Sequence, residues 1–218
     1  MTPGAAHKEG IESIVADHQI VERGNKAQQT RSRLLHAAVE SFAERGFHGT
    51  TTRDLAATAG MSPAAVYVHY PSKEHLLYEL SVMGHRKTLA QLDEHDNPGL
   101  PPADRLHRLI YAFALHHALD HTSARIVNYE LASLSAEHLI EIRELRRQIV
   151  ARVGTVVADG VASGAFRTTD PRAVNLAILS MNIDIARWYS ESGSLTPDAL
   201  AESYANLALR MVEADLGQ

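Results

Sequence analysis

Apolar residues recur three or four positions apart along most of the chain, which is the spacing that gathers them on one face of an α-helix. The first such segment starts at Thr30, and Gly46 is expected to end its helix. Its apolar stripe consists of Leu34, Leu35, Ala38, Phe42 and Phe47. No segment alternates with a period of two, so the pattern predicts an all-α protein with about nine helices.

Three further helices are predicted in quick succession. A short helix capped by Thr52 should stop at Gly60, and a second short helix should open at Ser62-Pro63 and run to about His69. A longer helix follows, with Ser72 as its cap. Its apolar face consists of Leu76, Leu77, Leu80 and Met83.

The second half of the chain begins with a segment, Asp93–Pro102, whose composition predicts a loop. Cap-then-proline pairs at Asp170-Pro171 and Thr196-Pro197 mark the start of two later helices. The helices predicted after the loop are Ala103–Leu119, Ser123–Leu134, Ala136–Ser163, Pro171–Ser190 and Pro197–Leu216. Residues 1–27 show no sustained apolar period and are interpreted as a flexible N-terminal arm, with a short helix over Ile11–Val21 as an alternative.

The segment Thr51–Tyr70, with the sequence TTRDLAATAGMSPAAVYVHY, has the layout of a helix-turn-helix. Its turn must be tight, and Gly60 can adopt the positive φ that such a turn needs. Leu55 and Val66 can fill the angle between the two helices. A second helix rich in alanine can enter a DNA major groove because short side chains do not hold it away.

Residues around this second helix are candidates for contact with DNA. Hydroxyl groups and cations near helix starts attract phosphates, and such contacts set the register of the protein on the duplex. The candidates are Thr51, Thr52, Arg53, Ser62, Ala64, Ala65, Tyr67, His69, Tyr70 and Lys73. For the two tyrosines, the alternative is a buried ring with an internally bonded hydroxyl.

Composition and charge narrow the classes of protein that remain. The 218-residue chain has a net charge of −5, yet residues 26–87 carry eight Lys/Arg against five Asp/Glu. This local excess favours one module that faces a polyanion. There is no cysteine, which excludes disulfides and thiolate sites. We expect a cytoplasmic protein that makes no membrane contact, since no stretch approaches ~20 apolar residues and the first residues lack a signal-peptide core.

Several motifs resemble the DNA-binding domain of the tetracycline-repressor (TetR) family, over Thr30–Leu77. They are FAERGF at 42–47, TTTRDLA at 50–56, AGMS at 59–62 and VYVHYPSKEHL at 66–76. Tyr70 departs from the family pattern, which usually has Phe there. The resemblance implies a helix-turn-helix DNA-binding domain at 28–74 and a helical bundle at 75–218 for ligand binding and dimerisation. It further implies a homodimeric repressor that a small molecule releases from double-stranded operator DNA.

The last two helices are expected to form the dimer surface, because many of their residues are small or aliphatic. The alternative is an intramolecular core, and both can hold if each helix has two apolar faces. The residues considered are Ala173, Leu176, Ala177, Leu179, Ser180, Ile183 and Ile185, then Leu200, Tyr204, Leu207, Ala208, Met211 and Val212.

Polar residues within the apolar periods of the bundle are candidates for effector binding. They are Arg125, Asn128, Tyr129, Asn182, Asp184, Arg187 and Trp188. The ending from Ala186 to Tyr189, continued through Leu195–Pro197, resembles a family branch that senses acyl-CoA thioesters, so an acyl-CoA is the effector class considered. An Arg can hold a phosphate or carboxylate and a Trp can stack on a ring. For each residue, a purely structural role is the alternative.

Two other functions remain as alternatives. His117 and His121 have the i, i+4 spacing that can hold zinc or nickel, which would make the protein a metal-responsive regulator. A small helical enzyme or a bundle for protein interactions is also conceivable, but the chain has no phosphate-binding loop, nucleophile elbow or H-E-x-x-H motif. The sequence therefore predicts a ligand-responsive DNA-binding regulator that is not an enzyme and uses no cofactor or metal.

Overall fold

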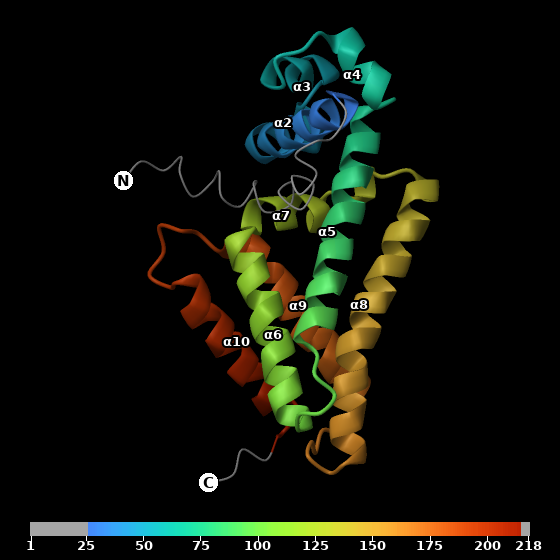
Figure 1. Ribbon diagram of the computed structural model, residues 1–218. Helices are drawn as coiled ribbons and strands as arrows, with labels where there is room; N and C mark the ends of the chain where they lie inside the picture. Colours follow the sequence, from blue (N-terminus) through green and yellow to red (C-terminus); the bar gives the residue numbers. More distant parts are fainter. Residues whose placement is uncertain (1–25, 215–218) are drawn as a thin grey trace. The chain divides into compact units, whose positions relative to one another are not determined.

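The computed structural model describes residues 26–214, and within them the protein is built from helices alone. Nine α-helices and one 3-10 turn are present in these residues, which confirms the all-α prediction. The elements in Figure 1 are α2 (Lys26–Gly49), α3 (Thr52–Thr58), α4 (Pro63–His69), α5 (Lys73–His95), α6 (Pro102–Leu119), α7 (His121–Tyr129), a 3-10 turn (Leu131–Ser133), α8 (Ala136–Ala162), α9 (Pro171–Trp188) and α10 (Pro197–Met211).

The predicted N-terminal arm, including the short helix at Ile11–Val21, lies outside the described residues, apart from Lys26 and Ala27, which open α2. The described chain forms two compact units. Unit 1 contains the described residues up to Gly84 together with Thr122–Ile142, and unit 2 contains His85–His121 and the described residues from Arg143 onward. Helices α5 and α8 each contribute one part to each unit. None of the described helices is long and apolar enough to span a membrane.

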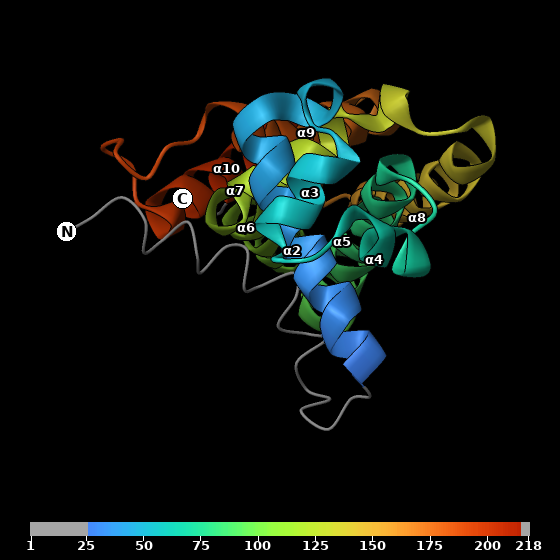
Figure 2. The same cartoon turned by 90° about the horizontal axis from the view of Figure 1, so that it is seen from above.

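In unit 1, α2 packs against the short helices α3 and α4 (Figure 2). The predicted stripe of α2 is buried, as are Leu55 and Val66, which fill the angle between α3 and α4. Gly46 has a φ of 70° and breaks the regular helix where the sequence placed its end, and one further turn continues to Gly49. The break occurs at glycine because an L-residue with a side chain rarely adopts this φ.

A polar cluster links the start of α5 to the start of α8 within unit 1. Glu74 accepts hydrogen bonds from the Ser135 amide and from the His138 ring, each at 2.8 Å. Tyr78 stacks on His138 with a centroid distance of 3.8 Å, and its hydroxyl donates to Glu141. Burial would raise the pKa of Glu74, but the bonds from Ser135 and His138 outweigh it and lower the pKa.

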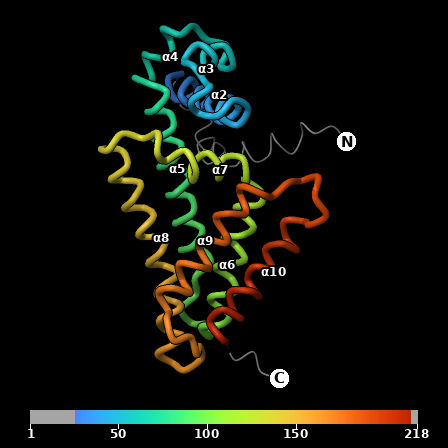
Figure 3. The backbone as a smooth tube through the Cα atoms, turned by 180° about the vertical axis from the view of Figure 1, so that it is seen from behind, coloured from blue at the N-terminus to red at the C-terminus, as the bar shows by residue number. Residues whose placement is uncertain are grey.

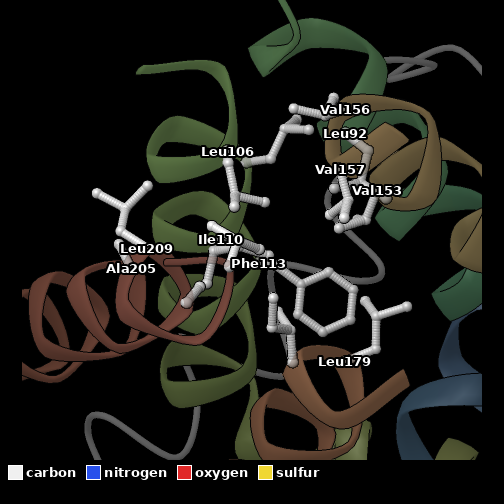
Figure 4. Packing of buried hydrophobic residues seen from close by; sticks show 14 of the residues in the cluster. Leu92, Leu106, Ile110, Phe113, Val153, Val156, Val157, Leu179, Ala205 and Leu209 are labelled. Atoms are coloured by element: carbon white, nitrogen blue, oxygen red, sulfur yellow. The ribbon is translucent and has the colours of Figure 1, made fainter. Parts of the chain in front are cut away.

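Unit 2 is a helical bundle in which α6 packs against α9 and α10 (Figure 3). Its core draws apolar side chains from five helices, and ten of them are labelled in Figure 4. They are Leu92 from α5, Leu106, Ile110 and Phe113 from α6, Val153, Val156 and Val157 from α8, Leu179 from α9, and Ala205 and Leu209 from α10. These residues span most of the second half of the chain, so only the folded bundle brings them together.

Several predicted helix boundaries need correction. Helix α5 continues to His95, so the loop is confined to residues 96–101 instead of Asp93–Pro102. The single helix predicted over Ser123–Leu134 is wrong, because α7 ends at Tyr129 and a 3-10 turn follows. Helices α8, α9 and α10 end one, two and five residues before the predicted ends at Ser163, Ser190 and Leu216.

The physical reason for the larger differences is long-range bonding. The buried Arg105 of α6 pairs with Asp96, the first residue of the 96–101 loop, and with Asp159 of α8, each at 2.8 Å. Ser135, whose amide is held by Glu74, caps α8 through a 3.2 Å bond from the His138 amide, so the chain leaves the helical path before this point. The Arg105–Asp159 and Glu74–Ser135 contacts do not follow from local spacing.

Candidate DNA-binding surface and effector-binding residues

The residue that caps the start of helix α3 lies one position earlier than predicted. Its N-cap is Thr51 and not Thr52. The Thr51 hydroxyl accepts from the Asp54 amide at 3.2 Å, and the Thr51 amide donates to the Asp54 carboxylate at 2.7 Å. Each residue thus accepts a hydrogen bond from the other's backbone amide through its side chain, and this reciprocal pair is a capping box. The T-x-x-D spacing was the signal that would have found it. The bonds to Thr51 also lower the pKa of Asp54.

The turn between α3 and α4 has the conformation that the sequence predicted for it. Gly60 has a φ of 63°. The Gly60 amide donates to Ala57 O at 3.0 Å, and the Met61 amide donates to Ala56 O at 2.8 Å. This is a Schellman motif, which closes the last carbonyls of α3. Arg33 of α2 adds a 2.6 Å bond from its guanidinium to Ala59 O, so the turn is also tied to the helix beneath it.

Helix α4 opens at Ser62 and Pro63 as predicted, with a 3.2 Å bond from the Ala65 amide to the Ser62 hydroxyl. Val66 alone among its residues is buried. Tyr67 is 55% exposed and Val68 is 80% exposed. Ser62 and Ala64 are also exposed, and Ala65 and His69 are partly exposed. Val68 is absent from the predicted contacts, although its position two residues after the buried Val66 places it outward.

The predicted flanking contacts have differing environments. Thr51 and Arg53 are exposed, Thr52 is partly exposed, and the Tyr67 hydroxyl lies 3.4 Å from the Thr52 hydroxyl, to which it donates. Tyr70 is buried, and desolvation raises its pKa to about 12. Its ring therefore follows the alternative that the sequence left open for the two tyrosines.

Lys73 differs from the exposed Arg53 because its ammonium points into the protein. It donates to Phe47 O at 2.7 Å and to Thr50 O at 2.8 Å. It also lies 4.4 Å from the centroid of the Phe47 ring. Two of its three N–H donors are thus engaged with backbone carbonyls.

The effector candidates fall into both units and do not form one group. Arg125, Asn128 and Tyr129 belong to α7 in unit 1, where Arg125 and Tyr129 are exposed. Asn128 donates to Ala124 O at 2.9 Å. Asn182, Asp184, Arg187 and Trp188 belong to α9 in unit 2.

Within α9, the candidates lie on different faces. Asn182 is fully buried and donates to Ile178 O at 2.7 Å, while its side-chain oxygen has no hydrogen-bond partner in residues 26–214. Arg187 is exposed and pairs with Asp184 at 2.9 Å. Trp188 is 45% exposed. Five residues separate Asn182 from Arg187, which places their side chains well apart around the helix.

Unit 2 also contains a buried cluster of basic side chains that the sequence did not place. His116 and His117 lie inside the bundle, and His117 stacks on Phe113 with a centroid distance of 4.4 Å. The His85 ring lies 3.4 Å from the Arg146 guanidinium. Burial lowers the pKa of His117 to about 4, opposed by its bond to Phe113 O. It lowers the pKa of His116 as well.

His117 and His121, the pair considered as metal ligands in the alternative function, are both bonded to backbone. The His117 Nδ1 lies 2.8 Å from Phe113 O, and the His121 Nδ1 lies 3.1 Å from Ala118 O. Over the described part of the chain, no three side chains of the types that bind metals gather in one place. The geometry thus offers no additional ligand beside His117 and His121.

Taken together, an outward helix of small residues, capped at Ser62 and joined by a tight glycine turn to a helix that packs on α2, defines a helix-turn-helix DNA-binding protein. Comparison with known proteins identifies the family to which it belongs. Residues 34–80 match the bacterial regulatory proteins of the tetR family, and residues 99–212 match the tetracyclin repressor-like C-terminal domain. The chain therefore belongs to the TetR family of transcriptional regulators.

Individual relatives agree with this assignment. The transcriptional repressor KstR2 of Rhodococcus jostii is 30% identical over 183 residues, which cover 82% of this chain and 89% of the relative. A crystal structure of a tetR-family regulatory protein from Rhodococcus RHA1 is 41% identical, with a TM-score of 0.82 and coverage of 88% of this chain and 100% of that one. The structure of AibR with isovaleryl coenzyme A and operator DNA has a TM-score of 0.76 at 22% identity and shares the fold, covering 85% of this chain and all of that one. Members of the family regulate transcription, so the enzyme alternative is set aside.

Proposed function

We propose that the protein is a homodimeric repressor that binds operator DNA in the cytoplasm and leaves it when a small molecule, of the acyl-CoA class, binds the C-terminal bundle. In this proposal, residues 28–74 bind DNA, and residues 75–218 bind the effector and form the dimer. The observation that supports DNA binding is the outward face of α4. Its side chains are small or exposed, and Val66 is the single residue of this helix that is buried. A helix presented in this way fits a major groove.

Two kinds of DNA contact are proposed for this surface. Side chains on α4 would face the base edges, and groups at the start of α3 together with the Tyr67 hydroxyl would hold the phosphates. The proposed base-facing residues are Ser62, Ala64, Ala65 and His69. The proposed phosphate-facing residues are Thr51, Thr52, Arg53 and Tyr67. Tyr70 and Lys73 are not included, because Tyr70 is buried and the Lys73 ammonium is bonded to backbone carbonyls.

A charge placed on α4 tests the groove fit. Ala64→Glu puts a carboxylate among the phosphates while sitting in the first turn of α4, where a negative charge favours the helix. We expect a loss of affinity of roughly 100-fold or more for the DNA upstream of its own gene, because like charges at an interface cost several kcal/mol. The matched control is Ala151→Glu, at an exposed position on α8. Equal affinities for the two variants in a gel-shift titration would refute the proposed groove contact.

The homodimer is supported by an apolar face that α9 and α10 leave exposed. Ile185 of α9, Leu200 and Ala208 of α10, and Val212 directly after α10 are buried within the chain. On the other side of these helices, exposed small and aliphatic residues follow the i, i+3, i+4 spacing of one helix face: Ala173, Leu176, Ala177 and Ser180 on α9, and Leu207 on α10. Such a face suits close packing across a two-fold axis. A sedimentation mass near 23.9 kDa, the mass of one chain, would refute the dimer.

The effector class is supported by the relatives. AibR, which shares the fold, was crystallised with isovaleryl coenzyme A and operator DNA, and KstR2 of Mycobacterium tuberculosis is described as a ketosteroid transcriptional regulator. The proposed effector contacts in this chain are Arg125, Asn128, Tyr129, Asn182, Arg187 and Trp188. Asn182 supports an internal polar contact because its side-chain oxygen is buried and has no hydrogen-bond partner within residues 26–214.

The effector half is tested by thermodynamic linkage. A ligand that lowers operator occupancy 100-fold has a preference of about 2.7 kcal/mol for the state that does not bind DNA. Operator DNA must then lower the affinity of that ligand by the same factor. Acyl-CoAs of different chain length, with free coenzyme A and the free acids as controls, are titrated with and without operator. An acyl-CoA that binds equally well in both cases would refute release by this class.

A further inference from the structure

The Lys73 ammonium holds the segment that leads from α2 into α3. Its two backbone partners, Phe47 O and Thr50 O, lie on this segment at 2.7 Å and 2.8 Å. Hydrogen bonds to a charged donor are stronger than neutral ones. A contact from the first residue of α5 thus fixes a stretch of backbone 23 to 26 positions earlier in the chain.

Other contacts also hold this segment, which adjoins the proposed DNA contacts. Thr50 is buried, and its hydroxyl donates to Ser41 O at 3.0 Å or to Gly46 O at 2.8 Å. Phe47 packs on Phe42 with a centroid distance of 5.3 Å. The next residue after Thr50 is Thr51, the N-cap of α3 and the first of the proposed phosphate contacts. The backbone that Lys73 holds is therefore directly adjacent to these contacts.

Arg53 offers a contrast within the same region. It is exposed, and in residues 26–214 its guanidinium makes no hydrogen bond or ion pair, so it remains available to a phosphate. Arg33 resembles Lys73 instead, because its guanidinium donates to Ala59 O at 2.6 Å, at the far end of α3. Two of the cations in the basic excess of residues 26–87 are therefore directed at the two ends of α3.

We infer that Lys73 is a positioning residue for DNA binding: it sets the start of α3 through Phe47 O and Thr50 O, while Arg53 carries the phosphate contact. The inference rests on the proposed DNA surface. It replaces a direct contact at Lys73 by an indirect one, and the two roles differ in salt dependence. Each neutralised phosphate contributes about 0.9 to the slope of log K against log salt.

The test compares Lys73→Met with Arg53→Met on the DNA upstream of the gene, at a temperature where circular dichroism shows each variant fully folded. Methionine keeps an unbranched apolar stem and removes the charge and the donors. We expect Lys73→Met to lose about tenfold in affinity at every salt concentration, because two hydrogen bonds from a charged donor are removed, and to retain the wild-type slope. Arg53→Met should lower the slope by about 0.9. A slope lowered by the same amount in Lys73→Met, or an unchanged affinity, overturns the inference.

A second variant and a second measurement keep the test decisive if Lys73→Met does not fold. Lys73→Arg preserves the charge, so a phosphate contact would keep both affinity and slope, whereas a planar guanidinium cannot reproduce two carbonyl bonds made by a compact ammonium. Positioning predicts reduced affinity with an unchanged slope. Amide exchange at residues 47–52 should be faster in Lys73→Arg and unchanged in Arg53→Met. This readout needs no DNA, so slow exchange in Lys73→Arg refutes positioning even where operator binding itself fails.

Discussion

The helix-turn-helix and the bundle of unit 2 keep their shapes by different means. In α3 and α4, the bonds that cap the helices and close the turn join residues three to five apart, as in the Thr51–Asp54 box and the Ala56–Met61 bond of the turn. In unit 2, the core joins side chains from α5 to α10 that lie up to about half the chain apart (Figure 4). Short-range bonds fix a surface that must match a constant DNA groove. Long-range packing leaves room for an interior that differs between members of one family.

The largest expected effect follows from this long-range packing. Ile110→Ala removes a fully buried side chain from the centre of α6. Because the transfer free energy of the lost methyl groups is added to the cost of a cavity, the free energy of unfolding should fall by about 2–5 kcal/mol. Urea unfolding at one fixed protein concentration measures it.

The control for this change is Ile140→Ala at the start of α8, where the side chain is 65% exposed. Its free energy of unfolding should stay within about 0.5 kcal/mol of the wild type. If both variants lost the same small amount, the packing in Figure 4 would not be what stabilises unit 2.

The second effect is a difference in acid sensitivity between the two regions. Burial lowers the pKa of His117 from 6.5 to about 4, so the unfolded state binds this proton more readily than the folded state. Its contribution to stability is complete above pH 6.5 and is lost as the pH falls towards 4, by roughly 3 kcal/mol in all. For Asp54 at α3, a lowered pKa gives a contribution that is lost only below 3.8.

Unit 2 should therefore weaken at a higher pH than the helix-turn-helix. His117→Phe keeps a ring stacked near Phe113 and removes the titration, so its unfolding free energy should depend less on pH between 6.5 and 4 than that of the wild type. His116 retains part of the effect because its pKa is lowered too. Denaturant unfolding at a series of pH values gives the comparison, and parallel curves for the two proteins would contradict it.

This contrast also explains which features the sequence could predict. Caps and turns are local, so Ser62-Pro63, Asp170-Pro171, Thr196-Pro197 and Gly60 were found from spacing alone. The start of α3 was misplaced by one residue because Thr51 and Thr52 are chemically alike, and only the bond to Asp54 distinguishes them.

Long-range bonds set the features that spacing could not predict. The start of the loop before α6 is held by Arg105, which pairs with Asp96 and also reaches Asp159, 54 residues away. Polar residues within the apolar periods were equal candidates in the sequence, yet Asn182 is buried while Arg187 and Trp188 are exposed. The sequence could not predict the direction of the Lys73 side chain either, because a lysine at the start of a helix is usually interpreted as a solvent-exposed charge.

The smallest expected effect tests how strictly the local bonds set the DNA-binding surface. Gly60→Ala puts a side chain at a φ of 63°, which costs roughly 1–2 kcal/mol for an L-residue. The new Cβ would lie 3.7 Å from the Arg33 guanidinium, an ordinary contact, so the cost comes from the backbone conformation alone. We expect a lower thermal midpoint and weaker DNA binding, because relief of the strain would turn α4 away from its angle to α3.

Gly49→Ala is the matched control, at the last residue of α2, where a Cβ would lie 3.6 Å from the Arg45 Cβ and no positive φ is required. Alanine costs less backbone entropy than glycine, so this variant should be as stable as the wild type or slightly more stable. Differential scanning fluorimetry and a gel-shift titration report both quantities. If Gly60→Ala matched Gly49→Ala in both, the turn would have freedom to relax, and the angle of α4 would be set by packing on α2, as the bundle is, instead of by its own short-range bonds.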